Sequence, residues 1–189
     1  MGELLKLRVF LALPLAGVFA AEVSPLILEL KQKHPGIRWV PASEIHATLH
    51  FFGAIKKDDI PGISELITPL TKAARPFHLR LEGLGAFPNA ARPRVVWIGI
   101  RGETAPLVEL RSRIEARLKE NGYACEKREF RPHATIGRIK EGLGGRGFET
   151  IKFGPTSSKI VEELILFQSH PAPQGAHYEA IATYPLAAA

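Results

Sequence analysis

Two short motifs stand out because each combines an imidazole with a hydroxyl. They are HATL at 46–49 and HATI at 133–136. In an extended strand, residues two apart point to the same face, so each His lies beside its Thr while the alanine and the aliphatic residue face the core. A hydroxyl can donate to a phosphate oxygen, and an imidazole can hold or deliver a proton near pH 7. Each motif therefore predicts half of a site for a phosphate group.

Two such pairs on opposite sides of one phosphorus atom would supply both an acid and a base. In-line displacement needs this arrangement, because one group deprotonates the incoming oxygen while the other protonates the leaving oxygen. Protonated imidazole and the two hydroxyls can stabilise charge on the phosphoryl oxygens, so the chemistry needs no metal and no other cofactor. One His-x-Thr alone carries little information in a chain with seven histidines, and the repetition is the stronger signal.

The motifs occupy matching places in a repeated unit. A buried strand is predicted from Arg8 and again from Arg94, and helices are predicted over 17–33 and 104–120. Thr104 is a candidate N-cap of the second helix, and Asn121-Gly122 a stop signal. From Arg8 to His46 the chain advances 38 residues, and from Arg94 to His133 it advances 39. The sequence therefore predicts strand, helix and His-x-Thr strand, twice.

This pattern predicts an α+β protein with two similar lobes, approximately 8–87 and 94–184, within a single domain covering 1–189. A pseudo-twofold axis would bring the two motifs face to face. The remaining predicted elements are a helix over 58–74, a strand over 77–87 that bends at its glycines, and strands at 149–153, 160–168 and 178–184. The glycine-rich loop at 142–147 is either a lid over the site or a loose connection.

Composition favours an anionic partner. The chain has 25 Lys+Arg against 19 Asp+Glu, a net charge of +6 and a pI of about 9.6, and a basic surplus favours nucleic acid. A single cysteine, Cys125, excludes an internal disulfide and fits a reducing cytoplasm. Residues 6–21 have the outline of a secretory signal, but Pro14 and Gly17 interrupt the apolar run, so a strand leading into a helix and a cytoplasmic protein are expected.

A metal site is the competing interpretation of the first motif. His46 and His50 are four residues apart, the spacing of a helical zinc site, and His133 would be a third ligand. However, HATLHFF at 46–52 is predicted to be a strand, which places His46 and His50 about 13 Å apart at ~3.3 Å per residue. That separation is too large for a shared ion, so no metal is expected and the role of His50 stays open.

The regions around both motifs, HATLHFFG at 46–53 and FRPHATIGR at 130–138, resemble the 2H phosphoesterases. The similarity is greatest to the RNA 2',3'-cyclic phosphodiesterases, historically called 2'-5' RNA ligases or LigT-like proteins. It extends over nearly the whole chain, including RVFLALPL at 8–15 and the segment from 87 to RVVW at 94–97. The resemblance implies a bilobal fold in which antiparallel sheets line a central cleft and helices lie outside.

The resemblance also implies roles. In that family the reaction opens a 2',3'-cyclic phosphate and leaves a 2'-phosphate. His46 would be the general acid that protonates the departing 3'-oxygen, and His133 the general base that activates water. Thr48 and Thr135 would bind the phosphate oxygens.

Two further positions carry over, each five residues after a motif histidine. The resemblance implies that Phe51 stacks on a nucleobase and that Arg138 neutralises the phosphate. Strict alternation puts both on the face opposite the histidines, so a bulge or the strand's end must re-aim them, and the sequence shows no bulge. Core packing is the competing interpretation for Phe51. Arg131 is a further candidate for contact with RNA.

Three functions remain open. The first is metal-independent hydrolysis of RNA 2',3'-cyclic phosphate ends. The second keeps the fold but joins or cleaves 2'-5' linkages in tRNA halves, or opens a small cyclic nucleotide. The third is an RNA-binding protein without turnover. Paired histidines favour an enzyme, because Arg or Lys would serve simple binding better. No membrane partner is expected, and the protein is expected to be a monomer.

Overall fold

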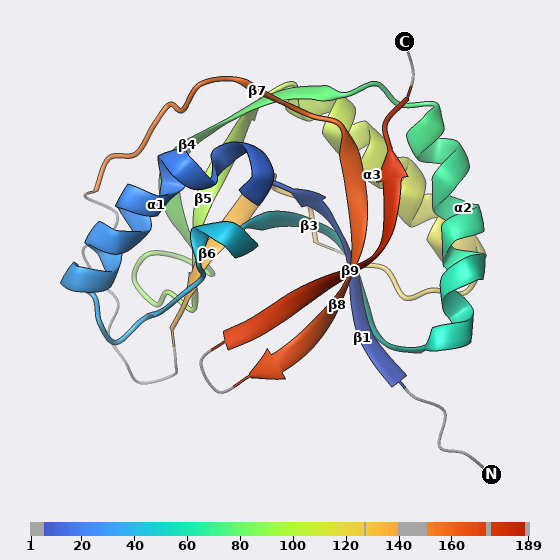
Figure 1. Ribbon diagram of the computed structural model, residues 1–189, viewed down its shortest axis with the longest axis horizontal. Coiled ribbons are helices and arrows are strands. Elements are labelled where there is room, and N and C mark those ends of the chain that lie inside the picture. The colour runs from blue at the N-terminus through green and yellow to red at the C-terminus, as the bar shows by residue number, and fades with distance from the viewer. Residues whose placement is uncertain (1–5, 127, 140–150, 173–174, 188–189) are drawn as a thin grey trace.

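The fold consists of three α-helices and nine strands within the part of the chain that the structure describes (Figure 1). A computed structural model describes residues 6–126, 128–139, 151–172 and 175–187. The helices are α1 (Ala16–Lys33), α2 (Ile60–Lys72) and α3 (Thr104–Glu120). The strands are β1 (Lys6–Pro14), β2 (Arg38–Trp39), β3 (His46–Lys56), β4 (Phe77–Phe87), β5 (Val95–Gly102), β6 (His133–Arg138), β7 (Lys159–Val161), β8 (Glu163–Ala172) and β9 (Gly175–Pro185).

The strands form two antiparallel sheets. The first has the order β3-β1-β8-β9 and the second the order β2-β6-β5-β4-β7. Their buried faces are built from alternating apolar residues, such as Val9, Leu11 and Leu13 in β1, which have no exposed surface. Two antiparallel sheets with separate helices confirm the predicted α+β class.

The two sheets do not coincide with the expected segments 8–87 and 94–184. β4 lies in the second sheet beside β5, and β8 lies in the first sheet beside β1. The short connection after β4 explains this exchange, because it closes a hairpin in which the Arg94 N–H donates to the Phe87 carbonyl at 2.8 Å. The orders β3-β1-β8 and β6-β5-β4 therefore match, with the third strand of each contributed by the other half of the chain.

The two longest helices, like the exchanged strands, pack against the other half of the molecule. Figure 1 shows α1 on the side of β4–β6, and α2 and α3 on the side of β8 and β9. In α1 the Glu22 carboxylate accepts from the backbone of Ser157 at 3.0 Å, next to β7 of the second sheet. In α3 the Arg111 guanidinium donates to the Leu49 carbonyl of β3 at 3.0 Å. Each long helix thus covers the sheet that does not contain the strand preceding it.

The start of α3 differs from the predicted capping. The sequence predicts Thr104 at the N-cap, but Glu103 takes that place and Thr104 is the first helical residue. The Glu103 carboxylate is occupied by the His78 N–H at 2.8 Å and by Arg75 at 2.7 Å, which anchors the turn one residue earlier. The predicted stop is confirmed, since α3 ends before Asn121 and the following glycine has a φ of 85°.

Two middle elements are close to prediction. The expected helix over 58–74 is α2, and a 3₁₀ turn at Lys57–Asp59 precedes it because the Asp59 carboxylate accepts the Lys56 N–H at 2.9 Å. The bend expected in β4 lies at Gly83, where the register against β5 shifts and φ is 74°.

The C-terminal strands depart further from prediction. The single strand expected over 160–168 is two strands, because β7 pairs with β4 in the second sheet and β8 pairs with β1 in the first. The strand expected at 178–184 is β9. Of the expected strand at 149–153, the described part, 151–153, is not a strand. The loop at 142–147 lies outside the described residues.

The stretch with the outline of a secretory signal is β1 and the beginning of α1, as predicted. Phe19 and Leu15 follow the strand and are fully buried in the same core. In the described part of the chain, no helix combines the length and apolar character that crossing a bilayer requires.

Candidate active site

The two motifs lie on β3 and β6, which contact each other between the sheets. His46 and Thr48 are register partners of alternate residues in β1, and His133 and Thr135 are register partners of alternate residues in β5. Alternate residues share a face, so each histidine projects beside its threonine. The structure therefore brings together the four motif residues that the sequence predicted.

A β-bulge interrupts each motif strand three residues after the histidine. The register of β3 against β1 leaves out Leu49, and that of β6 against β5 leaves out Ile136. The extra residue shifts the alternation by one, so two consecutive residues are buried in each strand: Leu49 with His50, and Ile136 with Gly137.

These bulges turn Phe51 and Arg138 to the face that carries the histidines. Phe51 pairs with Phe10 of β1, and Arg138 pairs with Val95 of β5, in line with the partners of the motif residues. The Phe51 side chain is 49% exposed, which corrects the alternative that it packs in the core. The conflict between strict alternation and the positions five residues after each histidine is thereby resolved.

The backbone fixes both imidazoles in the same way. His46 Nδ1 lies 2.8 Å from the Glu44 carbonyl, and His133 Nδ1 lies 2.6 Å from the Arg131 carbonyl. A carbonyl only accepts, so Nδ1–H donates in both rings and Nε2 is left to exchange a proton with a ligand. The acceptor is two residues before the histidine in each motif, so the repeat extends to this contact.

Aromatic rings enclose the two histidines to different degrees. The His46 ring lies 4.9 Å from Phe10 and 4.9 Å from Tyr178, and 6.1 Å from Phe167, between ring centroids. The His133 ring lies 4.9 Å from Phe87, with Trp97 at 6.1 Å. None of these aromatic residues was predicted as part of the site. Phe10, Phe167 and Trp97 stand in apolar strand segments, where the sequence reads as ordinary core.

The different enclosures change the acid–base properties of the histidines. Burial, together with the charges of Arg138 and His133, lowers the pKa of His46 to about 4, against the opposing effect of the Glu44 carbonyl. Burial also lowers the pKa of His133, and the Arg131 carbonyl again opposes it. Both imidazoles are therefore neutral at pH 7 before an anion binds.

Two adjoining cavities meet at the motif residues. The larger, of about 900 Å³, is lined by His133, Thr135 and the described residues of the segments 125–126 and 128–131, and the smaller, of about 380 Å³, is lined by His46. Thr48, Phe51 and Arg138 line both cavities. A ligand that holds its phosphate between the two histidines therefore has space on either side.

Arg131 lies at the rim of the larger cavity. Its side chain is 73% exposed and lies 3.8 Å from the Glu129 carboxylate. The backbone carbonyl of Arg131 holds the ring of His133, so the residue contributes a fixed contact to the site in addition to an exposed cation.

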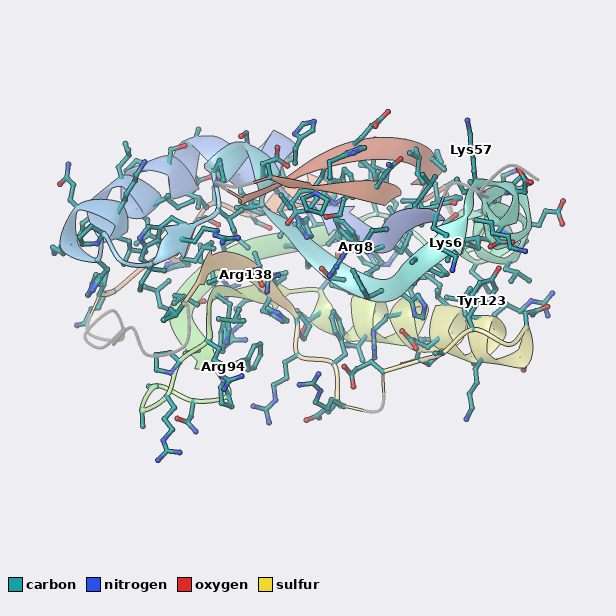
Figure 2. All side chains as sticks on the ribbon, turned by 90° about the horizontal axis from the view of Figure 1, so that it is seen from below. Lys6, Arg8, Lys57, Arg94, Tyr123 and Arg138 are labelled. Carbon is teal, nitrogen blue, oxygen red and sulfur yellow. The ribbon has the colours of Figure 1, made fainter. Side chains whose placement is uncertain are left out.

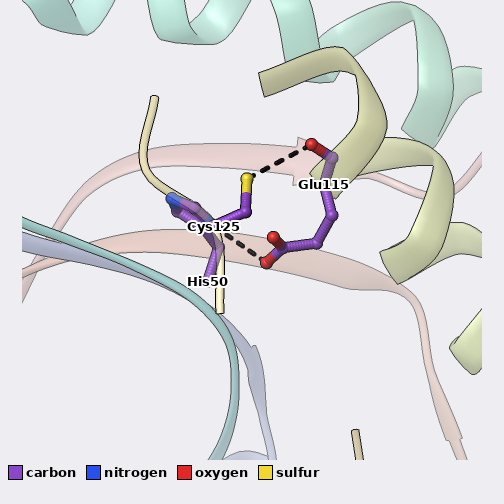
Figure 3. A group of neighbouring side chains, drawn as sticks. All are labelled: His50, Glu115 and Cys125. Carbon is purple, nitrogen blue, oxygen red and sulfur yellow. Dashed lines mark hydrogen bonds and ion pairs between the residues drawn. The ribbon is translucent and has the colours of Figure 1, made fainter. Parts of the chain in front are cut away.

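His50 forms a group with Glu115 and Cys125 (Figure 3), and all three residues line the larger cavity. His50 Nδ1 lies 2.8 Å from Glu115 Oε1, and the Cys125 thiol donates to the Glu115 carbonyl at 3.3 Å. The donor atoms of the three side chains lie within 4.8 Å of one another, which is a spacing compatible with metal ligands. However, the Arg111 guanidinium lies 3.3 Å from the same carboxylate, so a cation at this place would meet a fixed positive charge.

Arg111 connects this group to β3 and to the segment that precedes β6. Its Nε donates to the Leu49 carbonyl at 3.0 Å, which is the carbonyl of the bulged residue. The guanidinium also lies 4.8 Å from the ring of Phe130, three residues before His133. This group is thus best explained as support for the bulge, and nothing in the sequence of α3 marked Arg111 for this part.

The chain is similar to proteins of one family in both sequence and structure. The sequence pattern of the 2'-5' RNA ligase superfamily matches residues 19–143. A protein of Archaeoglobus fulgidus named RNA 2',3'-cyclic phosphodiesterase is 34% identical over 134 residues, which are 71% of this chain and 73% of that protein.

Solved structures share the fold over nearly the whole chain. A crystal structure from Thermus thermophilus has a TM-score of 0.81 and 26% identity, covering 95% of this chain and 98% of that one. The structure of Escherichia coli LigT complexed with 3'-AMP has a TM-score of 0.76 and 25% identity, covering 96% and 99%. On the match of the family pattern to two thirds of its residues, this chain belongs to the 2'-5' RNA ligase superfamily.

Proposed function

We propose that this protein hydrolyses the 2',3'-cyclic phosphate ends of RNA and leaves a 2'-phosphate. One observation carries the proposal: two histidines, each held through Nδ1 by a backbone carbonyl and each beside a threonine, face adjoining cavities. The name of the Archaeoglobus fulgidus relative, RNA 2',3'-cyclic phosphodiesterase, supports this choice of reaction and substrate.

In the proposed reaction the two imidazoles act on opposite sides of phosphorus. Nε2 of His133 takes a proton from water as the water oxygen bonds to phosphorus. Nε2–H of His46 gives a proton to the 3'-oxygen as the bond from phosphorus to that oxygen breaks. One proton is taken up and one is released, and exchange with solvent then restores the starting state.

Three side chains at the meeting point of the cavities would hold the phosphate. Thr48 and Thr135 would donate to non-bridging oxygens, and Arg138 would balance the negative charge that increases in the transition state. These donors supply the stabilisation that a metal ion supplies in other phosphodiesterases, so the proposed reaction proceeds without one. Phe51, exposed in both cavities, would stack on the nucleobase next to the reacting phosphate.

The proposed acid begins in the wrong protonation state. With its pKa lowered to about 4, His46 is neutral at pH 7, so the bound phosphate must raise this pKa before the 3'-oxygen leaves. The reverse assignment, with His133 as acid, requires the same total number of protons on the pair. A pH–rate profile alone therefore does not separate the two assignments.

A substrate with sulfur in place of the 3'-oxygen separates them. A thiolate leaves without a proton, so the loss of the acid should matter much less with this substrate. We expect His46→Ala to recover most of its lost activity on the sulfur substrate and His133→Ala to recover little. The opposite pattern would exchange the two roles.

The function itself is tested on RNA ending in a 2',3'-cyclic phosphate, in EDTA and without ATP. We expect turnover, with the phosphate on the 2' position of the product. A 3'-phosphate product, a requirement for added metal, or tight RNA binding without turnover would contradict the proposal. Addition of an RNA with a free 5'-hydroxyl tests whether the same site also joins RNA ends through a 2'-5' linkage. Size-exclusion chromatography tests the expectation that the protein is a monomer.

A further inference from the structure

Three arginines surround the smaller cavity beside His46. Arg8 comes from β1, Arg38 from β2 and Arg138 from β6, and no carboxylate is among the described residues that line this cavity. None of the three forms an ion pair within the described residues. Figure 2 shows Arg8 and Arg138 in the central part of the molecule in the view from below. Arg138 balances the single charge of a cyclic phosphate between the histidines, which leaves the two positive charges of Arg8 and Arg38 in excess.

The position of Arg38 is unfavourable without an anion. Arg38 and Arg138 are direct register partners across β2 and β6. Like charges placed directly opposite in antiparallel strands repel each other, and an acidic residue at either position would remove the repulsion. The rest of β2 consists of Trp39, whose ring packs against Gly137 of β6, so the register of this short strand is fixed by packing.

Arg8 is held in place by the neighbouring strand β3 of its own sheet. Its guanidinium carbon lies 5.0 Å from the centre of the Phe51 ring. Such a stacked guanidinium keeps its hydrogen-bond donors free for a ligand, because an aromatic face uses none of them. Arg8 and Arg38 therefore approach the smaller cavity from two sheets, each beside a residue assigned to the terminal nucleotide.

In the larger cavity, carboxylates compensate most of the cations. Its exposed arginines are paired with acidic neighbours, Arg128 with Glu126 at 2.9 Å and Arg131 with Glu129 at 3.8 Å. A polyanionic chain would meet these carboxylates on that side. The unpaired cations of the smaller cavity provide the path of lower energy for an RNA chain that continues from the site.

We propose that Arg8 and Arg38 form a subsite for the phosphodiester that joins the terminal nucleotide of RNA to the preceding nucleotide. This inference rests on the proposed function and makes oligoribonucleotide ends, rather than cyclic mononucleotides, the preferred substrates. The terminal nucleotide carries the cyclic phosphate on its 2' and 3' oxygens, and its 5' oxygen carries the next phosphate. Two anions on one nucleotide thus meet two groups of cations.

The test compares a dinucleotide with a 2',3'-cyclic end and the corresponding cyclic mononucleotide. We expect Arg38→Gln to lower the ratio of their kcat/KM values about tenfold, and Arg8→Gln with Arg38→Gln to lower it further. The salt dependence of kcat/KM for the dinucleotide should weaken in parallel. Arg138→Gln should lower kcat/KM for both substrates by the same factor and so preserve the ratio, because Arg138 binds the reacting phosphate.

Arg117→Gln is the matched control, because this exposed arginine of α3 pairs with Glu120 at 3.9 Å and lies away from both cavities. It should leave the ratio as in the wild type. An unchanged ratio in the Arg8 and Arg38 variants would overturn the subsite, as would a loss shared equally by both substrates.

Binding separates this inference from the proposed function. In the His133→Ala background, a dinucleotide ending in a 2'-phosphate should bind at least tenfold tighter than the mononucleotide 2'-phosphate, and Arg38→Gln should remove the difference. Absence of turnover in the wild type with this binding difference intact would contradict the function alone. Equal affinities of the two ligands would contradict the subsite alone.

Discussion

The surroundings of His46 and His133 differ although their backbones are alike. Both imidazoles donate to the carbonyl two residues earlier, and both strands have a bulge three residues later. Yet three aromatic rings enclose His46, and its pKa is lowered to about 4. The duplicated strand therefore fixes the positions of the two imidazoles. The aromatic neighbours, which differ between the two halves, determine the pKa of each imidazole.

The difference originates at the edges of the two sheets. β9 is an 11-residue strand beside β8, and it places Tyr178 against His46. Its counterpart in the second sheet, β7, has three residues and contributes no ring to His133. The asymmetry of the site is thus a consequence of one long edge strand.

The largest expected effect comes from removing either imidazole. His46→Ala and His133→Ala should each reduce kcat by roughly 10²–10⁴-fold, because each removes one proton transfer from the same displacement. Steady-state kinetics on a cyclic substrate measures this loss. His78→Ala, at an exposed strand position, is the control and should keep wild-type activity. A variant at either motif that retained near wild-type turnover would show that the two histidines are not partners.

The threonines test whether the two halves bind phosphate equally. Thr48→Val and Thr135→Val each remove one donor to a phosphate oxygen with little change of shape, and we expect losses of kcat/KM of about tenfold to a hundredfold for both. Inorganic phosphate should also inhibit both variants less strongly. A large loss in one variant and none in the other would restrict phosphate binding to one half of the site.

Tyr178→Ala should make the environments of the two histidines, and therefore their pKa values, more alike. Loss of the ring admits water beside His46, and since burial is the main cause of its lowered pKa, that pKa should rise toward the ordinary value. NMR titration of the imidazole measures the shift, and the acidic limb of kcat/KM should move to higher pH. Tyr178→Phe keeps the ring and should leave the pKa near 4. A lowered pKa that persisted in Tyr178→Ala would assign the effect to other neighbours.

The smallest expected effect concerns the support of one bulge. Arg111→Met removes the donor to the Leu49 carbonyl, and loss of this charged hydrogen bond should destabilise the fold by about 1–3 kcal/mol. Because the bulge orients Phe51, KM should increase several-fold while kcat changes less. Thermal unfolding and kinetics measure the two effects. Arg113→Met, on the outer side of α3, is the control, and an equal change in kcat and KM would count against an effect through Phe51.

The sequence predicted the elements that local patterns define. Apolar periodicity located β1, β5, α1 and α3, and the repeat placed both motifs on equivalent strands. The partners of those strands depend on contacts between distant segments, so the exchange of β4 and β8 between the sheets did not follow from either half alone.

The sequence predicted which residue types form the site, but it did not predict the directions in which their side chains point. A bulge is a property of two paired strands, so the sequence of β3 did not reveal that Phe51 turns toward His46. The same applies to Arg38, whose neighbour Arg138 is 100 residues away along the chain. Tyr178 reached His46 only through the position of β9 at the edge of the first sheet.

The exchange of strands also constrains the order in which the chain acquires its structure. During synthesis β1 and β3 emerge early, but their sheet stays open along one edge until β8 has been made. β1 is one of the most apolar strands of the molecule, so an unpaired β1 edge is a site for aggregation. Long-range closure of this kind predicts slow refolding, and chains truncated before β8 should require chaperones to remain in solution.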